Sequence, residues 1–196
     1  MITINYVPNK INSITDYNTV YQSGKIKEKN PVINFEYCKI EPGFKIIKID
    51  IKASEQIRCI QEAEEANRAV VVCFWISQLA IINDLDESRS NYPIHKEGVH
   101  FCNSNYSLKF ESSGKKNAKG YMLVMDKTWL KKKILNMKVL DFFMNRGSRI
   151  ESWPITLSSW KNINIPFDEN AKNQFSQEWQ LTIVGWTLLG NLCSNI

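Results

Sequence analysis

The sequence predicts an α+β protein that is mainly β, in which a β-barrel or sandwich is followed by C-terminal helices. Short β-branched and aromatic runs recur about every ten residues with turn signals between them, as in all-β barrels and sandwiches. After Met125 the spacing of apolar residues changes to that of a helix. The 196 residues are enough for one domain with an appended helical part.

Three regions follow from this change of pattern. Residues 1–30 are polar and rich in Asn, Ser and Lys, so we expect an N-terminal arm or loosely packed lead-in. Residues 31–126 contain the strand-like runs and form the predicted β-barrel domain. Residues 127–196 form the predicted helical region, and its last helix is the candidate dimerisation element.

The strand candidates are short runs of β-branched and aromatic residues bounded by turn residues. They are Phe35–Ile40, Phe44–Lys52, Ile57–Gln61, Ala69–Gln78, Gly98–Cys102, Ser107–Glu111 and Gly120–Met125. A Glu-Pro-Gly sequence at residues 41–43 predicts a turn between the first two strands. Residues 112–116 are predicted to be the hairpin loop between the last two.

The run Ala69–Gln78 is apolar on both faces, which predicts a central strand buried on both sides. One face carries Val70, Val72, Phe74 and Ile76, and the other carries Val71, Cys73, Trp75 and Ser77. The second face mixes one large aromatic side chain with small, weakly polar ones, as the wall of a ligand cavity does. The alternative is that Trp75 fills the core and donates its indole N–H to a backbone carbonyl.

Three helical segments are expected after the last strand. Asp126 can cap a helix through Lys127–Leu135, and Val139–Met144 forms a second short piece. In the terminal segment apolar residues recur at steps of four and three, which is a coiled-coil-like seam. The seam consists of Phe175, Trp179, Thr182, Trp186, Leu189 and Cys193. Such a helix needs a surface to bury it, provided by its own domain or by a second copy of the chain.

Composition excludes several classes of protein. The net charge of +5 is mild, and the basic run Lys131–Lys133 is interpreted as the solvated face of a helix, not as a nucleic-acid site. The 5 cysteines are scattered without a CxxC motif, as in a reduced cytosolic protein. No signal-peptide pattern opens the chain, and its apolar runs are too short to span a bilayer. We therefore expect a cytoplasmic protein without a membrane partner.

Few residues offer catalytic chemistry. A β-barrel invites a metal site built from several histidines, but only His95 and His100 are present, and their spacing on an extended segment places them on opposite faces. His100 and Cys102 share a face, yet no third group is available to orient them as a catalytic pair. No phosphate-loop, dinucleotide, zinc-protease or nucleophile-elbow motif occurs. We therefore expect no metal, no cofactor and no enzyme activity.

The order of these parts resembles a known family of regulators. The patterns that carry the resemblance are Glu41-Pro42-Gly43-Phe44, Val70–Ser77, Gly98-Val99-His100-Phe101 and Met125–Leu130. Through them, residues 35–196 resemble the N-terminal effector-sensing and dimerisation domain of AraC-family transcription regulators. The resemblance implies a cupin-like (jelly-roll) β-barrel without a catalytic metal, a small-molecule cavity inside it, and helices that pair two subunits.

The resemblance also implies a function. We expect a small-molecule-sensing and dimerisation domain with an unidentified effector, which forms a homodimer and contacts DNA only through a further helix-turn-helix domain. Residues 1–196 show no recognition helix with exposed basic residues. A stand-alone cupin-like barrel enzyme, such as an isomerase or dioxygenase, and a non-catalytic interaction scaffold are the two alternatives.

The expected functional residues fall into two sets. The predicted ligand pocket is formed by Phe44, Cys73, Trp75, His100 and Tyr121. The predicted dimer interface is formed by Phe175, Trp179, Trp186 and Leu189.

Overall fold

The structure of the chain is a computed structural model. The backbone is described for residues 2–6, 21–23, 32–52, 57–61, 68–75, 79–82, 98–104, 108–112, 118–145, 151–154, 174–194 and 196. The side chains are described for residues 36–50, 68–74, 99–104, 119–145, 178–194 and 196.

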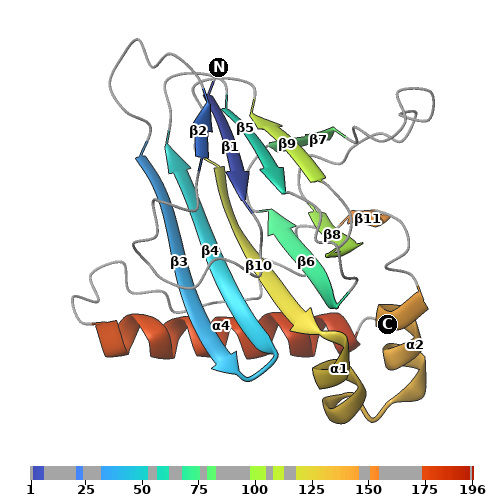
Figure 1. Cartoon of the computed structure of the whole chain (residues 1–196). Helices are drawn as coiled ribbons and strands as arrows, with labels where there is room; N and C mark the ends of the chain where they lie inside the picture. Colours follow the sequence, from blue (N-terminus) through green and yellow to red (C-terminus); the bar gives the residue numbers. More distant parts are fainter. Residues whose placement is uncertain are drawn as a thin grey trace.

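The larger of two β-sheets has six antiparallel strands in the order β11-β8-β6-β10-β4-β3 (Figure 1). The strands are β3 (Val32–Glu41), β4 (Phe44–Lys52), β6 (Ala69–Trp75), β8 (Gly98–Asn103), β10 (Ala118–Asp126) and β11 (Glu151–Pro154). The long strands β3, β4 and β10 form one half of the sheet, and the short β6, β8 and β11 form the other. The predicted central strand is confirmed, because β6 pairs on both sides and its described side chains are buried.

The second sheet has five strands in the order β2-β1-β5-β9-β7. They are β1 (Ile2–Tyr6), β2 (Tyr21–Ser23), β5 (Ile57–Gln61), β7 (Leu79–Ile82) and β9 (Leu108–Ser112). The β1–β5 pair is parallel and the other pairs are antiparallel. No ladder joins the two sheets among the described strands, so the protein is α+β and mainly β, but these strands do not form a closed jelly-roll barrel.

Among the described residues, three helices accompany the larger sheet: α1 (Lys127–Lys133), α2 (Met137–Asn145) and α4 (Gln174–Ser194). Helix α4 contacts β3 and β4 and runs across the end of the sheet where these strands turn (Figure 1). It is continuous through Gly185 and Gly190, so neither glycine breaks it. None of the described helices is long and apolar enough to cross a membrane.

The two faces of the larger sheet bury different sets of side chains, because residues alternate along each strand. The helix-covered face contributes Cys38, Phe44, Ile46, Val70, Val72, Phe74, Val99, Phe101, Tyr121, Leu123 and Met125. The helices contribute Trp129, Leu130, Val139, Phe143, Leu181, Val184, Leu188, Leu189 and Leu192. The opposite face is also buried and carries Ile47, Ile49, Val71, Cys73, His100, Cys102, Met122 and Val124.

The structure differs from the predicted elements in several places. Strands β1 and β2 lie within residues 1–30, where only a lead-in was expected, and β1 pairs with β5. Strand β7 and, within the predicted helical region, strand β11 were not predicted. The predicted hairpin around residues 112–116 is wrong, because β9 pairs with β5 and β7 in one sheet whereas β10 pairs with β4 and β6 in the other.

Helix α1 begins as predicted but ends two residues early. Asp126 is its N-cap residue, but the Asp126 side chain makes no capping hydrogen bond. Asn136 accepts hydrogen bonds from the backbone N–H groups of Lys138 and Val139, at 3.0 and 3.5 Å, and so begins α2. The chain between the two helices is therefore extended at Ile134, and Leu135 is exposed.

The turn between β3 and β4 is fixed by Gly43. Its φ of +89° lies in the left-handed region, which glycine adopts without steric cost. A Cβ atom at this position would also approach Trp129 Cβ to 2.9 Å. The backbone N–H of Asp126 donates a hydrogen bond of 2.8 Å to the Gly43 carbonyl, which ties the turn to the end of β10.

We therefore expect Gly43→Ala to lower the free energy of unfolding by about 1–3 kcal/mol, because the new methyl group meets both backbone strain and Trp129. Chemical denaturation of the dilute protein measures this change. Gly190→Ala is the matched control, since a Cβ at Gly190 would meet no atom within 4 Å and the substitution should stabilise the helix by up to about 1 kcal/mol. Equal stability of the two variants would contradict the role of the turn.

Candidate functional site

The predicted pocket residues lie on two faces of the larger sheet. Cys73 on β6 is the register partner of His100 on β8, and both side chains are buried on the face away from the helices. Phe44 and Tyr121 belong to the helix-covered core. The backbone of Trp75 pairs with Gly98 and Gly120, and its side chain lies outside the described residues.

These residues therefore do not line one cavity. On β10, Met122 is the partner of Cys73 and Tyr121 is the partner of Phe74, so Tyr121 lies on the opposite face from Cys73. A shift of one residue along a strand reverses the face that a side chain occupies, and the sequence alone does not give the register between distant strands. The grouping of Phe44 and Tyr121 with Cys73 and His100 was wrong for this reason.

Cys73 is a poor nucleophile. Burial raises the pKa of Cys73 well above its usual value, and the neighbouring Cys102 raises it further. A protonated thiol is neither a strong nucleophile nor a metal ligand. Within the described ranges, no group of three or more His, Cys, Asp or Glu residues is placed to hold a metal ion.

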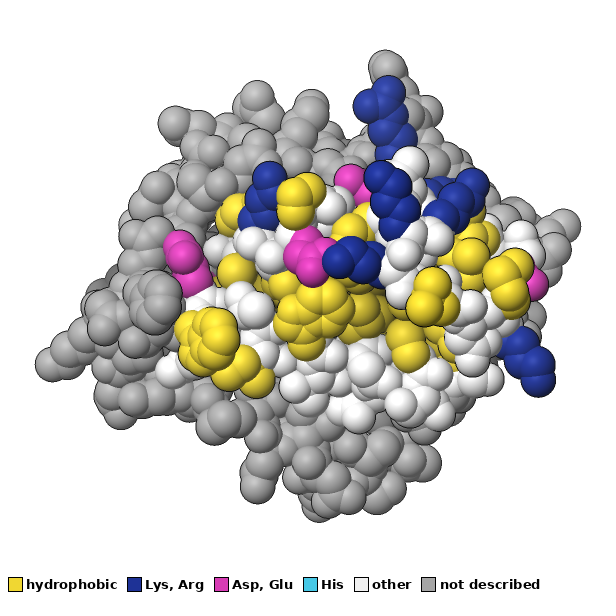
Figure 2. Space-filling view, turned by 90° about the horizontal axis from the view of Figure 1, so that it is seen from below, with side chains coloured by type: hydrophobic (Ala, Val, Ile, Leu, Met, Phe, Trp, Pro, Cys, Tyr) yellow, Lys and Arg dark blue, Asp and Glu magenta, His cyan; other side chains and the backbone are white. Residues whose placement is uncertain are grey.

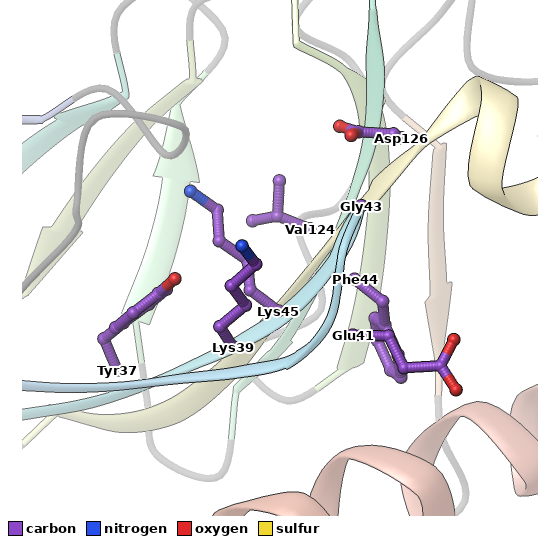
Figure 3. A pocket seen from close by; sticks show the side chains of 8 residues that line it. All are labelled: Tyr37, Lys39, Glu41, Gly43, Phe44, Lys45, Val124 and Asp126. Carbon is purple, nitrogen blue, oxygen red and sulfur yellow. The ribbon is translucent and has the colours of Figure 1, made fainter.

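A pocket of about 190 Å³ lies at the tip of the β3–β4 hairpin (Figure 3). Its lining comes from β3, the turn, β4 and the end of β10: Tyr37, Lys39, Glu41, Gly43, Phe44, Lys45, Val124 and Asp126. In Figure 3 the side chains of Lys39 and Lys45 extend to the same side of the hairpin. The side chain of Glu41 extends away from them.

Two amino groups and one phenol define the polar side of this pocket. Lys39 and Lys45 are direct register partners on antiparallel strands, so their side chains share one face. The Lys45 Nζ lies 5.7 Å from the centroid of the Tyr37 ring, within the range of a cation–π interaction. Burial raises the pKa of Tyr37, with a further contribution from Cys38, so its hydroxyl is protonated and able to donate a hydrogen bond.

On the other side of the hairpin, Glu41 binds helix α1. Trp129 Nε1 donates a hydrogen bond of 3.0 Å to Glu41 Oε2, and the Lys133 Nζ lies 2.7 Å from the same oxygen. The hydrogen bond from Lys133 lowers the pKa of Glu41 most, followed by the hydrogen bond from Trp129. Glu41 therefore joins the strand end to both the first and last turn of α1.

Three aromatic rings join the hairpin, α1 and α4. The ring centroid of Phe44 lies 4.6 Å from that of Trp129 and 5.1 Å from that of Trp186, the second pair in an edge-to-face arrangement. Trp129 and Trp186 are 6.2 Å apart. Distances of this kind are typical of favourable aromatic pairs. The predicted pocket residue Phe44 and the predicted interface residue Trp186 are thus in contact within one chain.

Helix α4 approaches β3 closely at two further points. The thiol of Cys38 lies 3.4 Å from the Thr182 hydroxyl and 3.5 Å from the Glu178 carbonyl oxygen. A side chain at Gly185 would overlap Ile40 Cδ1, so the absence of one permits the close contact of helix and strand. One face of α4 is therefore buried against its own sheet.

The other face of α4 carries an exposed apolar stripe, defined here as Trp179, Ile183 and Trp186. Trp179 is 61% exposed, Trp186 41% and Ile183 40%. Figure 2 looks onto the underside of the molecule and shows hydrophobic side chains spread across it, with Lys and Arg side chains mostly in the upper part of the view. Residues 179, 183 and 186 are spaced by four and three, so they form one row along the helix.

The predicted interface set is divided by this arrangement. Trp179 and Trp186 lie on the exposed stripe, whereas Leu189 is 4% exposed and belongs to the core of its own chain. Leu189 was therefore wrongly placed in the interface, because the 3.6-residue period carries it to the buried side of α4. Phe175 lies one turn before Trp179 on α4, and its side chain is not among the described ones. Ile183 was missed.

Comparisons with known proteins add little to this geometry. No family model matches the sequence, and no match was found among curated proteins. Among solved structures, the chain is similar to the Schizosaccharomyces pombe Cnp3 cupin domain, with 13% sequence identity and a TM-score of 0.38. The match covers 58% of this chain and 81% of that domain. A similarity of this size assigns neither a family nor a function.

The contact of Glu41 with α1 predicts a pH dependence. The pKa of Glu41 is lower in the folded chain than in the unfolded chain, so its contribution to stability is present above the unfolded pKa. That contribution is lost as the pH falls through the folded pKa. We therefore expect Glu41→Gln to reduce the acid-side slope of unfolding free energy against pH, as measured by urea denaturation across the acidic range.

Glu36→Gln is the control for the loss of one carboxylate. Glu36 is on the same strand, but its carboxylate binds Lys48 at 3.0 Å instead of α1. An unchanged pH slope in the Glu41 variant would show that its ion pair is not coupled to folding.

Proposed function

We propose that this chain is a small-molecule-sensing and dimerisation domain of an AraC-type transcription regulator, which would act on DNA through a separate domain. The observation that carries the proposal is the exposed stripe of α4. Two tryptophans and an isoleucine in one row are unusual on a surface that faces only water. The pattern Glu41–Phe44, on which the sequence resemblance partly rests, forms the turn that contacts this helix.

The chemistry of the stripe favours a second copy of the chain as its occupant. Glu178 is the only charged residue between Gln174 and Ser194, so two copies of α4 meet without repulsion between rows of like charges. The stripe continues at Gly190, which lies four residues after Trp186 and is open to solvent. A twofold axis makes every contact occur twice, so a stripe with a large residue at one end and glycine at the other can complement itself.

This complementarity favours an antiparallel arrangement of the two α4 helices. If the twofold axis crosses α4 between Val184 and Gly185, Trp179 lies opposite the partner's Gly190. Ile183 then lies opposite the partner's Trp186. The large indole of Trp179 would occupy the space left by the missing side chain of glycine, whereas a parallel pair would set tryptophan against tryptophan at two levels.

The dimer interface can be tested with Trp179→Glu. We expect this variant to weaken self-association roughly tenfold or more, because a carboxylate at the centre of an apolar contact loses its hydration. Sedimentation velocity over a range of protein concentrations measures the change. Trp179 is a sharper choice than Trp186, since Trp186 also packs on Phe44 and Trp129 and its loss would disturb the fold.

Leu135→Glu is the matched control, because Leu135 is 89% exposed and lies off α4. It should dimerise as the unchanged chain does. A wild-type chain that stays monomeric at all concentrations, or a Trp179 variant that dimerises normally, would place the function elsewhere and favour an interaction scaffold. Fusion to a DNA-binding domain that represses a reporter only as a dimer would test regulation itself: repression should require Trp179 but not Leu135.

A further inference from the structure

The pocket at the tip of the β3–β4 hairpin has the chemistry of an oxyanion site. Lys39 and Lys45 are register partners beside the irregularity of the β3–β4 ladder that lies between Lys39 and Glu41. Because residues directly opposite each other on antiparallel strands share a face, both lysine side chains can reach one anion bound between them.

The surrounding residues limit what can bind. The Tyr37 ring lies beside Lys45 and its neutral hydroxyl offers a third donor, whereas Val124 forms an apolar wall. Asp126 lines the pocket beside Gly43, and its carboxylate disfavours a second negative charge at that end. A volume of about 190 Å³ is smaller than the pockets that enclose drug-sized ligands. These features suit a single small acid group.

We infer that this pocket binds a small oxyanion, a carboxylate or a phosphate group, through Lys39, Lys45 and Tyr37, and that it is the effector site of the proposed sensing domain. The ligand is recognised by charge-assisted hydrogen bonds from two ammonium groups and one phenol. The site is distinct from the expected pocket around Cys73 and His100, which lie on other strands of the sheet.

The route from this pocket to α4 is short. Phe44 and Glu41 line the pocket and also contact the helices: Phe44 touches Trp186 on α4, and Glu41 binds Trp129 and Lys133 on α1. Trp186 belongs to the exposed stripe. A ligand that draws Lys39 and Lys45 together changes the hairpin tip, and the tip fixes the position of an interface side chain. This coupling rests on the proposed function, because it presupposes a dimer through α4.

Calorimetric titration of the full chain with inorganic phosphate, acetate and glucose tests the site. We expect binding of phosphate or acetate but not of neutral glucose, and the stronger of the two acids identifies the class of the ligand. Lys39→Ala combined with Lys45→Ala should weaken binding tenfold or more. Tyr37→Phe keeps the ring beside Lys45 but removes the hydroxyl, so it should weaken binding several-fold with little change in stability.

Lys131→Ala combined with Lys132→Ala is the matched control, because it removes the same charge from exposed positions on α1. Absence of binding to either acid, or equal loss in the two double variants, would overturn the site, since equal loss indicates only diffuse attraction between the basic chain and anions. Normal stability of each variant, measured by thermal unfolding, separates loss of binding from loss of folding.

Sedimentation with and without the bound acid tests the coupling separately. We expect the dimer dissociation constant to change about fivefold or more on binding. Binding without any dimer would preserve the site and refute the proposed function. A dimer that binds neither acid would refute the oxyanion site but would not contradict the proposed dimerisation. Binding to a dimer whose dissociation constant does not change would overturn the effector role.

Discussion

The turn at Glu41–Phe44 is the constraint on which the arrangement of the hairpin, α1 and α4 depends. The positive φ of Gly43 lets the chain reverse while Trp129 lies directly against it. The reversal directs Phe44 into contact with Trp129 and Trp186, and it leaves Glu41 within reach of the Trp129 indole. Because these contacts share Trp129, displacement of the turn would disturb both helices. Aromatic packing and a charge-assisted hydrogen bond thus reinforce one another at a single point.

Helix α4 has one apolar face that its contacts with the sheet and the hairpin do not bury. The sheet offers one surface, so only one side of the helix is buried, through Leu181, Val184 and Leu188. A helix that is apolar around most of its circumference then retains an exposed row, and Trp179 is its most exposed member. Of the two options open at the level of sequence, burial in its own domain applies to one face of the helix, and pairing with a second copy is the proposal for the exposed face.

The sequence predicted local structure better than long-range pairing. The bounds of β4 and β5 are as predicted, since β-branched runs flanked by turn residues depend on neighbouring positions. The error at β9 and β10 has a different cause: two consecutive strands with a short polar connection pair in most proteins, but here each finds a better partner in a different sheet. The prediction of the candidate site failed for the same reason, because it depended on long-range strand pairing. The burial of Cys73 was correctly predicted from the apolar character of its strand, yet the register that places Cys73 and His100 on the opposite face from Tyr121 arises from pairing over some twenty to fifty residues, which no local pattern encodes.

Lys39 and Lys45 show the same limit within a single hairpin. Counting outward from a tight turn at Glu41–Phe44 would pair Ile40 with Lys45, but the irregularity between Lys39 and Glu41 shifts the ladder by one residue and makes Lys39 the partner of Lys45. Phe44, one position before Lys45, lies on the opposite face, because successive side chains of a strand point to opposite sides. The hairpin tip therefore presents its charges to one side and its aromatic and acidic contacts with the helices to the other. Lys45 and Phe44 are joined by one peptide bond, so a displacement of the backbone at Lys45 would act directly on the residue that packs against Trp186.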